Sequence, residues 1–241
     1  MGYEISVAVA PIRREPSDRS EMVSQGLYGE ELQILEKQEK WAMVRMQADG
    51  YEGWVDCKQF GEIQPGQEST QLSATLTFCT LPNKTNQWLA AGSVIAPDTT
   101  FSSQQPVWNG SEPHIEQCAL QFLNAPYLWG GRTVMGIDCS GFTQLVMKLN
   151  GISIPRDAYQ QADLGTEVTF VEEAITGDLA FFDNAEGRII HVGIVLRTSI
   201  ESVQIIHASG KVRIDALDHQ GIFNRELSAY SHKLRIIKRK K

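Results

Sequence analysis

Residues 126–142 read PYLWGGRTVMGIDCSGF, and this stretch decides the fold of the second half of the chain. Its glycines predict a tight turn, because glycine adopts backbone conformations that other residues avoid. Asp138 belongs to the residue types that favour the N-cap of a helix. Apolar residues then recur at helical spacing, at Phe142, Leu145, Val146 and Leu149. With Asn150-Gly151 as a stop signal, the stretch predicts a glycine-rich turn that leads into a helix with Cys139 in its first turn.

Cys139 is the first candidate for chemistry. A thiol in the first turn of a helix feels the helix dipole and unpaired backbone N–H groups, and both favour the thiolate, which is the reactive form. The flanking glycines would let the backbone approach a substrate closely. The alternative is that Cys139 is a small buried hydrophobic residue, as most free cysteines are. That interpretation suits the other cysteines, Cys57, Cys79 and Cys118.

Two of the five histidines, His191 and His207, lie inside apolar stretches that predict strands. If these strands pair, both imidazoles line one cleft, where one would hold the thiol proton and the other would fix its orientation and tautomer. The alternative is a Cys/His/His metal site, but no two cysteines have C-x-x-C spacing and nothing supplies local ligand spacing. We therefore expect a Cys–His–His catalytic set without a metal or another cofactor.

The chain from about residue 111 predicts an α+β domain. Ser111 could cap a helix that continues to about residue 122, ahead of the glycine-rich turn. Later apolar stretches predict strands at 178–182, 189–196, 203–208 and 234–238. Helices followed by a run of strands are typical of an α+β domain with an antiparallel sheet.

The chain before this domain reads as short strands. The stretches 3–10, 31–36, 40–46 and 51–55 predict strands separated by turns, which indicates a small barrel. Residues 62–70 are polar, contain Pro65 and Gly66, and are typical of a linker. A second strand-like stretch over 71–110 predicts another small β module.

Composition narrows the function classes. The chain has 241 residues and a formal net charge of −7, so nucleic acid is not expected as a partner, because phosphate binding depends on clustered Lys and Arg. No stretch approaches the roughly 20 apolar residues that a membrane-spanning helix needs, and no membrane partner is expected. Without a signal-peptide pattern at residue 1 we expect reduced thiols and a cytoplasmic location, unless a signal peptide was removed, which would make the protein periplasmic or secreted.

The same residues carry a family resemblance. The stretch 126–142, followed by HVGIV at 191–195 and IIHASG at 205–210, resembles the NlpC/P60 cysteine peptidases of bacterial cell-wall metabolism. Residues 9–32 and 49–56 resemble the bacterial SH3-like domain that precedes the peptidase in a subgroup. The resemblance implies a papain-like peptidase domain at 111–241, with helices packed on an antiparallel sheet, after two SH3-like barrels at 1–62 and 63–110.

The subgroup, of the dipeptidyl-peptidase VI type, cleaves γ-D-glutamyl-L-diamino acid bonds in peptidoglycan peptides. The resemblance implies that Cys139 is the nucleophile, His191 the general base and His207 the residue that orients it. It also implies contacts to a muropeptide with a free N-terminal L-Ala, for which the candidate residues are Glu21, Tyr51, Tyr127, Asp138, Ser140 and Arg156. Four of these stay open. Glu21 closes off the amino end of the site or is a solvated surface acid, and Tyr51 closes off the same end or packs in the barrel. Tyr127 is an oxyanion donor or a packed aromatic residue, and Arg156 binds the D-Glu carboxylate or forms an ion pair with Asp157 or another acid.

One position departs from the pattern. In PRDAYQQ at 155–161, Ala158 stands where relatives often carry a serine, which puts one substrate contact in doubt. We expect a monomeric endopeptidase of cell-wall peptide recycling, with diaminopimelate or lysine as the diamino acid. The alternatives are an amidase or acyltransferase on the same scaffold and a non-catalytic cell-wall-binding protein.

Overall fold

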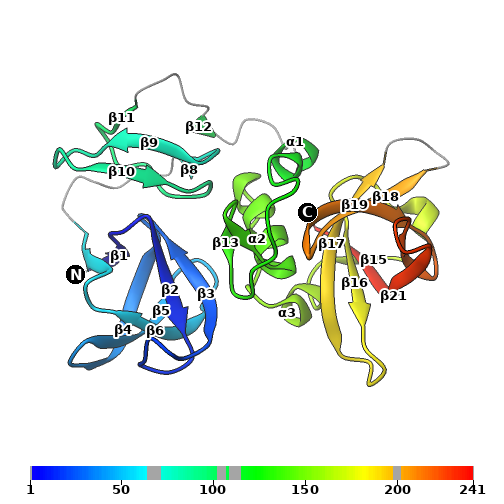
Figure 1. Cartoon of the computed structure of the whole chain (residues 1–241), viewed down its shortest axis with the longest axis horizontal. Helices are drawn as coiled ribbons and strands as arrows, with labels where there is room; N and C mark the ends of the chain where they lie inside the picture. The colour runs from blue at the N-terminus through cyan, green and yellow to red at the C-terminus, as the bar shows by residue number, and fades with distance from the viewer. Residues whose placement is uncertain (1, 64–71, 102–106, 109–114, 198–201, 241) are drawn as a thin grey trace. The chain divides into compact units, whose positions relative to one another are not determined.

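The computed structural model describes residues 2–63, 72–101, 107–108, 115–197 and 202–240. The chain divides into two compact units (Figure 1). The first contains Met1–Glu112 and Trp129–Val134, and the second contains Pro113–Leu128 and Met135–Lys241. Most of the predicted linker and the predicted cap Ser111 lie outside the described residues. The three-domain division remains a prediction.

The first unit opens with a seven-stranded antiparallel sheet in the order β3-β2-β6-β5-β4-β1-β7. Its strands are β1 (Tyr3–Ile5), β2 (Val9–Arg13), β3 (Met22–Leu27), β4 (Glu31–Gln38), β5 (Trp41–Met46), β6 (Glu52–Asp56) and β7 (Phe60–Glu62). Apolar side chains of these strands form one core that includes Ile5, Ile12 and Val44. The expected strand at 3–10 is therefore broken into β1 and β2, and β3 was not predicted.

The middle of the chain adds two smaller sheets to the first unit. They are built from β8 (Leu72–Ser73), β9 (Thr77–Thr80), β10 (Asn86–Leu89), β11 (Thr100–Phe101) and β12 (Val107–Trp108), with β10-β9-β11 in one sheet and β12-β8 in the other. Cys79, Leu81, Leu89 and Ile95 form a separate small core. A second SH3-like barrel here remains a prediction. The first unit also holds β13 (Arg132–Thr133).

The second unit is a seven-stranded sheet with three short α-helices among its described residues. These elements are α1 (Ile115–Leu120), β14 (Gly136–Ile137), α2 (Cys139–Leu149), α3 (Ala158–Ala162), β15 (Thr166–Val168), η1 (Val171–Glu173), β16 (Leu179–Asp183), β17 (Ile189–Arg197), β18 (Val203–Ser209), β19 (Lys211–Leu217), β20 (Gly221–Asn224) and β21 (Ala229–Arg239). Helix content is low, so the expected α+β class is confirmed only in part.

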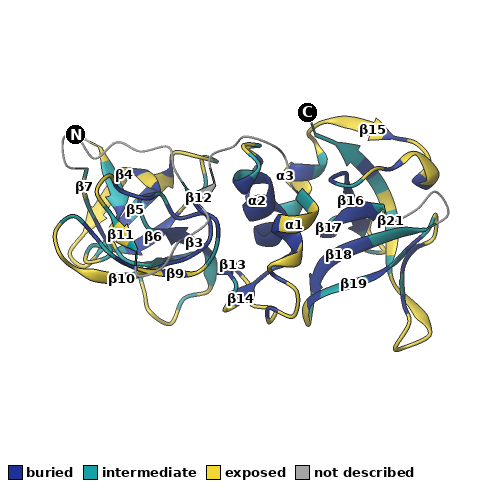
Figure 2. Ribbon diagram, turned by 90° about the horizontal axis from the view of Figure 1, so that it is seen from above, coloured by how far each residue is buried: buried dark blue, intermediate teal, exposed yellow. Residues whose placement is uncertain are grey.

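Helix α2 is the central element of this unit. Every residue in it except Lys148 is buried, as the dark blue colour in Figure 2 shows. It packs against β17 and β18. The predicted N-cap, Asp138, and the predicted end at Asn150 are both confirmed. The helix therefore presents its first residue to the middle of the sheet.

The sheet is antiparallel in the order β15-β21-β16-β17-β18-β19-β20, and β21 also pairs with β20. In the register of β17 with β18, Gly193 lies opposite His207. In the register of β18 with β19, His207 lies opposite Arg213 and Ile205 opposite Asp215. Strands β15, β19 and β20 and helix α3 were not predicted. Among the described residues, no helix is long and apolar enough to cross a membrane.

Candidate active site

Cys139 begins helix α2 and is 7% exposed. The Asp138 side chain caps the helix, since its Oδ1 accepts from the Gly141 N–H at 2.7 Å. The backbone N–H groups of Val192 and Ser140 donate to the Cys139 sulfur. Because Val192 directly follows His191 on β17, these contacts place the thiol beside the strand that carries the predicted base.

His191 and His207 meet as predicted. His191 Nε2 and His207 Nδ1 lie 2.8 Å apart, and the two rings are nearly perpendicular at 82°. Gly193 lies close to Ile205 and His207 on the neighbouring strand, because a Cβ at position 193 would lie 2.7 Å from Ile205 side-chain atoms and 2.8 Å from the His207 Cβ. The glycine of the HVGIV stretch therefore makes room for Ile205 and for the second histidine on the neighbouring strand.

Two further residues complete the cluster, and sequence reasoning missed both. Asp215 on β19 accepts from His207, with 3.0 Å between Oδ2 and Nε2. His232 on β21 stacks on His191 with ring centroids 4.2 Å apart and an interplanar angle of 22°. Neither lies in an apolar strand, so only the strand pairing could have revealed them.

Opposing electrostatic effects act on the Cys139 thiol. Burial raises the pKa of Cys139 to about 12, and the Asp138 carboxylate acts in the same direction. The backbone N–H groups of Val192 and Ser140 and the Arg156 guanidinium lower this pKa, but burial outweighs them. The N–H groups act on the thiol in the direction expected from its position, but the removal of water outweighs them.

The environment of His191 also disfavours its charged form and lowers its pKa. Burial lowers it well below its usual value, and His207 and His232 act in the same direction. Burial likewise lowers the pKa of His232 to about 4. At neutral pH the site therefore pairs a protonated thiol with a neutral imidazole, which is able to accept a proton.

The Arg156 side chain is 2% exposed and forms an ion pair. Its Nη1 and Nη2 donate to the two oxygens of Asp138 at 3.0 and 2.6 Å, and Nη1 also donates to Ser140 Oγ at 2.8 Å. Of the two alternatives from the sequence, this geometry is the ion pair with another acid. Arg156 therefore fixes the two residues that flank the nucleophile.

Three predicted contact residues lie farther from the cysteine in the sequence. Tyr127 is close enough for Cys139 and Asp138 to raise its pKa, which burial and these charges bring to about 12. Glu21 and Tyr51 belong to the first unit. There Glu21 Oε1 accepts from Trp129 Nε1 at 2.7 Å, and its Oε2 pairs with Arg14 at 3.0 Å.

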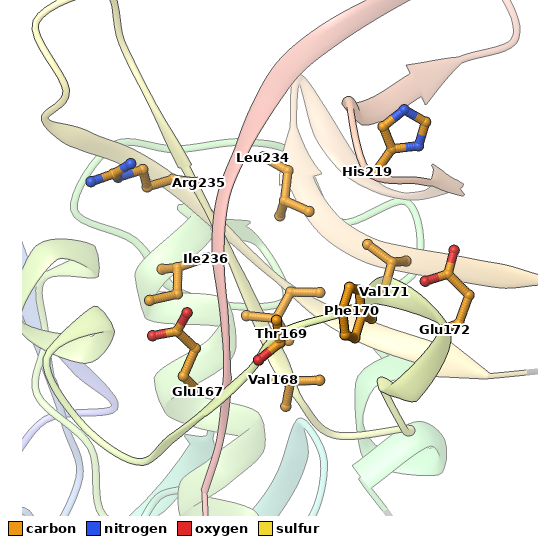
Figure 3. A pocket seen from close by; sticks show the side chains of 11 residues that line it. Glu167, Val168, Thr169, Phe170, Val171, Glu172, His219, Leu234, Arg235 and Ile236 are labelled. Carbon is orange, nitrogen blue, oxygen red and sulfur yellow. The ribbon is translucent and has the colours of Figure 1, made fainter.

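A hollow elsewhere in the second unit contains none of the predicted site residues. It has a volume of about 250 Å³ and is lined by β15, η1, His219 and β21 (Figure 3). Phe170 and Leu234 line it together with Glu167 and Glu172. Within the residues that the structure describes, no three His, Cys, Asp or Glu side chains are grouped as metal ligands.

The sequence matches two family models. One is described as the NlpC/P60 family and covers residues 124–230, which include Cys139, His191 and His207. The other is described as the bacterial dipeptidyl-peptidase Sh3 domain and covers residues 12–60. The expected order of an SH3-like domain followed by a peptidase domain is therefore confirmed.

Similar proteins agree with these matches. A gamma-D-glutamyl-L-lysine dipeptidyl-peptidase of Bacillus subtilis is 33% identical, over 71% of this chain and 68% of the relative. Dipeptidyl-peptidase 6 of Lysinibacillus sphaericus is 27% identical, over 91% of this chain and 93% of the relative. This chain spans about two thirds of the length of the Bacillus subtilis protein.

Among solved structures, an NlpC/P60 family protein from Bacillus cereus shares the fold with a TM-score of 0.80 and 20% identity, over 99% of both chains. An NlpC/P60 endopeptidase from Photobacterium damselae subsp. piscicida has a TM-score of 0.73 and 16% identity, over 98% of this chain and 70% of that chain. With a buried cysteine at a helix start and a histidine pair on the adjoining strands, the chain belongs to the NlpC/P60 family of cysteine peptidases and carries an N-terminal bacterial SH3-like domain.

Proposed function

We propose that the protein hydrolyses the γ-D-glutamyl–diamino acid bond of peptidoglycan-derived peptides with a free N-terminal L-Ala, in cell-wall peptide recycling. The observation that carries this proposal is the cluster in which Cys139 lies against the Val192 N–H while His191 is hydrogen-bonded to His207. The names of the Bacillus subtilis and Bacillus cereus relatives support the γ-D-glutamyl bond as the target and L-lysine as one diamino acid.

In the proposed reaction, Cys139 Sγ attacks the γ-carbonyl carbon while its proton moves to His191. The tetrahedral intermediate then collapses: the C–N bond breaks, and the proton on His191 goes to the amine of the departing diamino acid. Water then attacks the resulting thioester and gives a proton to His191; the C–S bond breaks, and the departing Cys139 thiolate takes that proton to regenerate the thiol. Because burial disfavours both a resting thiolate and a resting imidazolium, the proton moves during the attack rather than before it.

The developing oxyanion needs donors on the side of the thiol. The backbone N–H of Cys139 suits this role, because the first N–H groups of a helix have no acceptor within it. The Tyr127 hydroxyl is the second donor we propose. Its pKa of about 12 keeps it protonated, so it can donate at neutral pH.

The amino end of the substrate calls for carboxylates and hydrogen-bond acceptors. We assign Glu21, Tyr51, Asp138 and Ser140 to this end, with the carboxylates paired to the α-ammonium group. Arg156 acts there indirectly, by holding Asp138 and Ser140 in place. A peptide with a blocked amine would lose the charge pairing.

Mass spectrometry of the products tests the proposal. The purified protein is incubated with L-Ala-γ-D-Glu-diaminopimelate, with the L-lysine analogue, with the N-acetylated forms of both peptides and with intact peptidoglycan. We expect release of the free diamino acid from at least one free peptide, and a loss of most of the rate on its acetylated form. Equal cleavage of acetylated peptides or of intact wall would refute the assigned amino-end specificity, and cleavage at another bond would point to an amidase or acyltransferase.

A further inference from the structure

A series of hydrogen bonds continues from the His191–His207 pair to Asp215 and Arg213 on a third strand, β19. His207 Nε2 lies 3.0 Å from Asp215 Oδ2. Arg213 donates to both oxygens of Asp215, from Nε to Oδ2 at 2.7 Å and from Nη2 to Oδ1 at 3.0 Å. Exposure is 1% for His207 and 5% for Asp215. Because water hardly reaches these groups, their donors and acceptors have to match one another.

The charge of Asp215 determines which groups donate and which accept in this series of hydrogen bonds. Burial would raise its pKa, but hydrogen bonds from His207 and Arg213 outweigh burial and leave the pKa below its usual value. Asp215 is therefore a carboxylate, which accepts hydrogen bonds and donates none. It follows that the hydrogen in its bond with His207 lies on His207 Nε2.

The remaining hydrogens follow in turn. A neutral imidazole with its hydrogen on Nε2 offers only an acceptor at Nδ1. In a neutral His207, Nδ1 accepts, and the hydrogen of the 2.8 Å contact then belongs to His191 Nε2. A neutral His191 with its hydrogen on Nε2 has a lone pair on Nδ1, where it can take the thiol proton.

A hydrogen on His191 Nδ1 instead of Nε2 would block the proposed reaction. A positively charged His207 would donate from both nitrogens, so His191 Nε2 would have to accept. The hydrogen of His191 would then lie on Nδ1, which could not receive a proton from Cys139. The other groups that face this pair are His232, stacked on His191, and Arg213, which is also bonded to Glu226.

We propose that Asp215 is a positioning residue that acts through His207 to hold His191 as the Nε2–H tautomer, with Nδ1 as the atom that receives the Cys139 proton. The inference rests on the proposed role of His191 as the base. It extends the catalytic set by one residue that touches neither the thiol nor the substrate. Arg213 supports it by occupying both carboxylate oxygens of Asp215.

Nitrogen-15 NMR of the histidine-labelled wild-type protein tests the tautomer without any substitution in the chain. The signals are assigned with His191→Gln and His207→Gln variants. We expect His191 and His207 both to carry their hydrogen on Nε2 at neutral pH. A hydrogen on His191 Nδ1, or a His207 that is protonated on both nitrogens, would overturn the proposal.

The Asp215→Asn variant tests the positioning role. An asparagine has one acceptor oxygen where Asp215 serves two partners, so His207 or Arg213 loses its acceptor. We expect kcat to fall roughly 10- to 100-fold, less than the ~10⁴-fold effect of an Asp→Asn change next to a catalytic histidine, while KM stays nearly constant. The matched control is Asp218→Asn, because Asp218 bonds Tyr230 and the Gly221 N–H outside this chain of residues.

The rate of alkylation of Cys139 by iodoacetamide, mapped by mass spectrometry, gives a readout that needs no peptide. We expect Asp215→Asn to slow alkylation at neutral pH and Asp218→Asn to leave it unchanged. Unchanged alkylation and unchanged kcat in a folded Asp215→Asn protein would contradict the inference. If that variant does not fold, the NMR result decides. If the wild type cleaves no peptide, the proposed function fails, while the tautomer and alkylation still decide this inference.

Discussion

Two buried arginines make similar ion pairs in the two units of the chain. Arg156 in the second unit donates to both oxygens of Asp138, and Arg132 in the first unit donates to both oxygens of Glu30 at 2.8 and 2.9 Å. Arg132 also donates to the Gln25 carbonyl at 2.7 Å. All four charged side chains are buried. The chemistry is the same, but the two pairs hold different things.

The Arg156–Asp138 pair fixes the start of a helix beside a thiol, whereas the Arg132–Glu30 pair holds a segment of the chain in place. Arg156 holds the N-cap Asp138 next to Cys139 and lowers the thiol pKa. Arg132 lies in the six-residue segment Trp129–Val134, which interrupts the peptidase sequence but belongs to the first unit. A buried ion pair therefore does not by itself mark a reaction site; its neighbours decide its role.

Arg156→Met should have the largest effect. It leaves the buried Asp138 carboxylate without its partner, and we expect the free energy of unfolding to fall by about 3–5 kcal/mol. It should also raise the pKa of the Cys139 thiol further, because a positive charge that lowers it is gone. Urea unfolding and the pH dependence of alkylation measure the two effects. Arg156→Lys, which keeps the charge, should recover part of both, and a stability loss below about 1 kcal/mol would contradict the assigned pair.

Arg132→Met should cost a comparable amount of stability but leave the thiol unchanged. The Glu30 carboxylate would be buried without its partner, so we expect a loss of about 3–5 kcal/mol in the unfolding free energy of the first unit. The pH dependence of Cys139 alkylation should match the wild type. A shift in that profile as large as that of Arg156→Met would show that the two pairs do not differ in the way described.

In the histidine cluster, burial outweighs the Asp215 counter-charge, and the resulting pH dependence has a definite sign. Burial lowers the pKa of His232 to about 4, whereas an unfolded histidine titrates near ~6.5. Between these values the unfolded state binds more protons, so stability rises with pH from about 4 to about 6.5 and is lost as pH falls through this window. His232→Gln should reduce the proton uptake on unfolding near pH ~5 by up to about one proton. Unfolding curves across this range measure it, and an unchanged slope would argue against a depressed pKa.

Loss of an exposed ion pair should change the unfolding free energy least. Arg45 and Glu52 lie 2.6 Å apart across β5 and β6, with side chains 49% and 46% exposed. Because water screens such a pair, Arg45→Ala should change the unfolding free energy by no more than about 0.5 kcal/mol. Urea unfolding beside Arg132→Met measures the contrast within one unit. A loss close to that of the buried pair would undermine the argument from burial.

Local patterns made part of the fold predictable. Asp138, the apolar spacing and the Asn150-Gly151 stop define helix α2 within a dozen residues, and strands β16 to β18 follow from their apolar runs. Strand β3 was missed because Ser24 and Gln25 occupy buried positions in it. Gln25 is buried because it serves the Arg132 segment, a partner more than a hundred residues away.

The residues of the candidate site also divide into those that local sequence patterns predict and those that depend on strand pairing. Cys139, His191 and His207 have local signals, a helix start and two apolar strands. Asp215 does not, because a charged residue in the alternating stretch of β19 looks solvent-facing until the pairing with β18 is known. The net direction of the thiol pKa was not predictable for a related reason: the helix start is visible in the sequence, but the burial that outweighs it depends on strands far along the chain.

The most direct test of the nucleophile is the kcat/KM of two cysteine variants on the free tripeptide that the wild type cleaves. Cys139→Ala removes the proposed nucleophile, while Cys57→Ala removes a half-buried thiol in the first unit. We predict a loss of at least about 10³-fold for Cys139→Ala and near-wild-type activity for Cys57→Ala. Retention of full activity in Cys139→Ala would contradict the account.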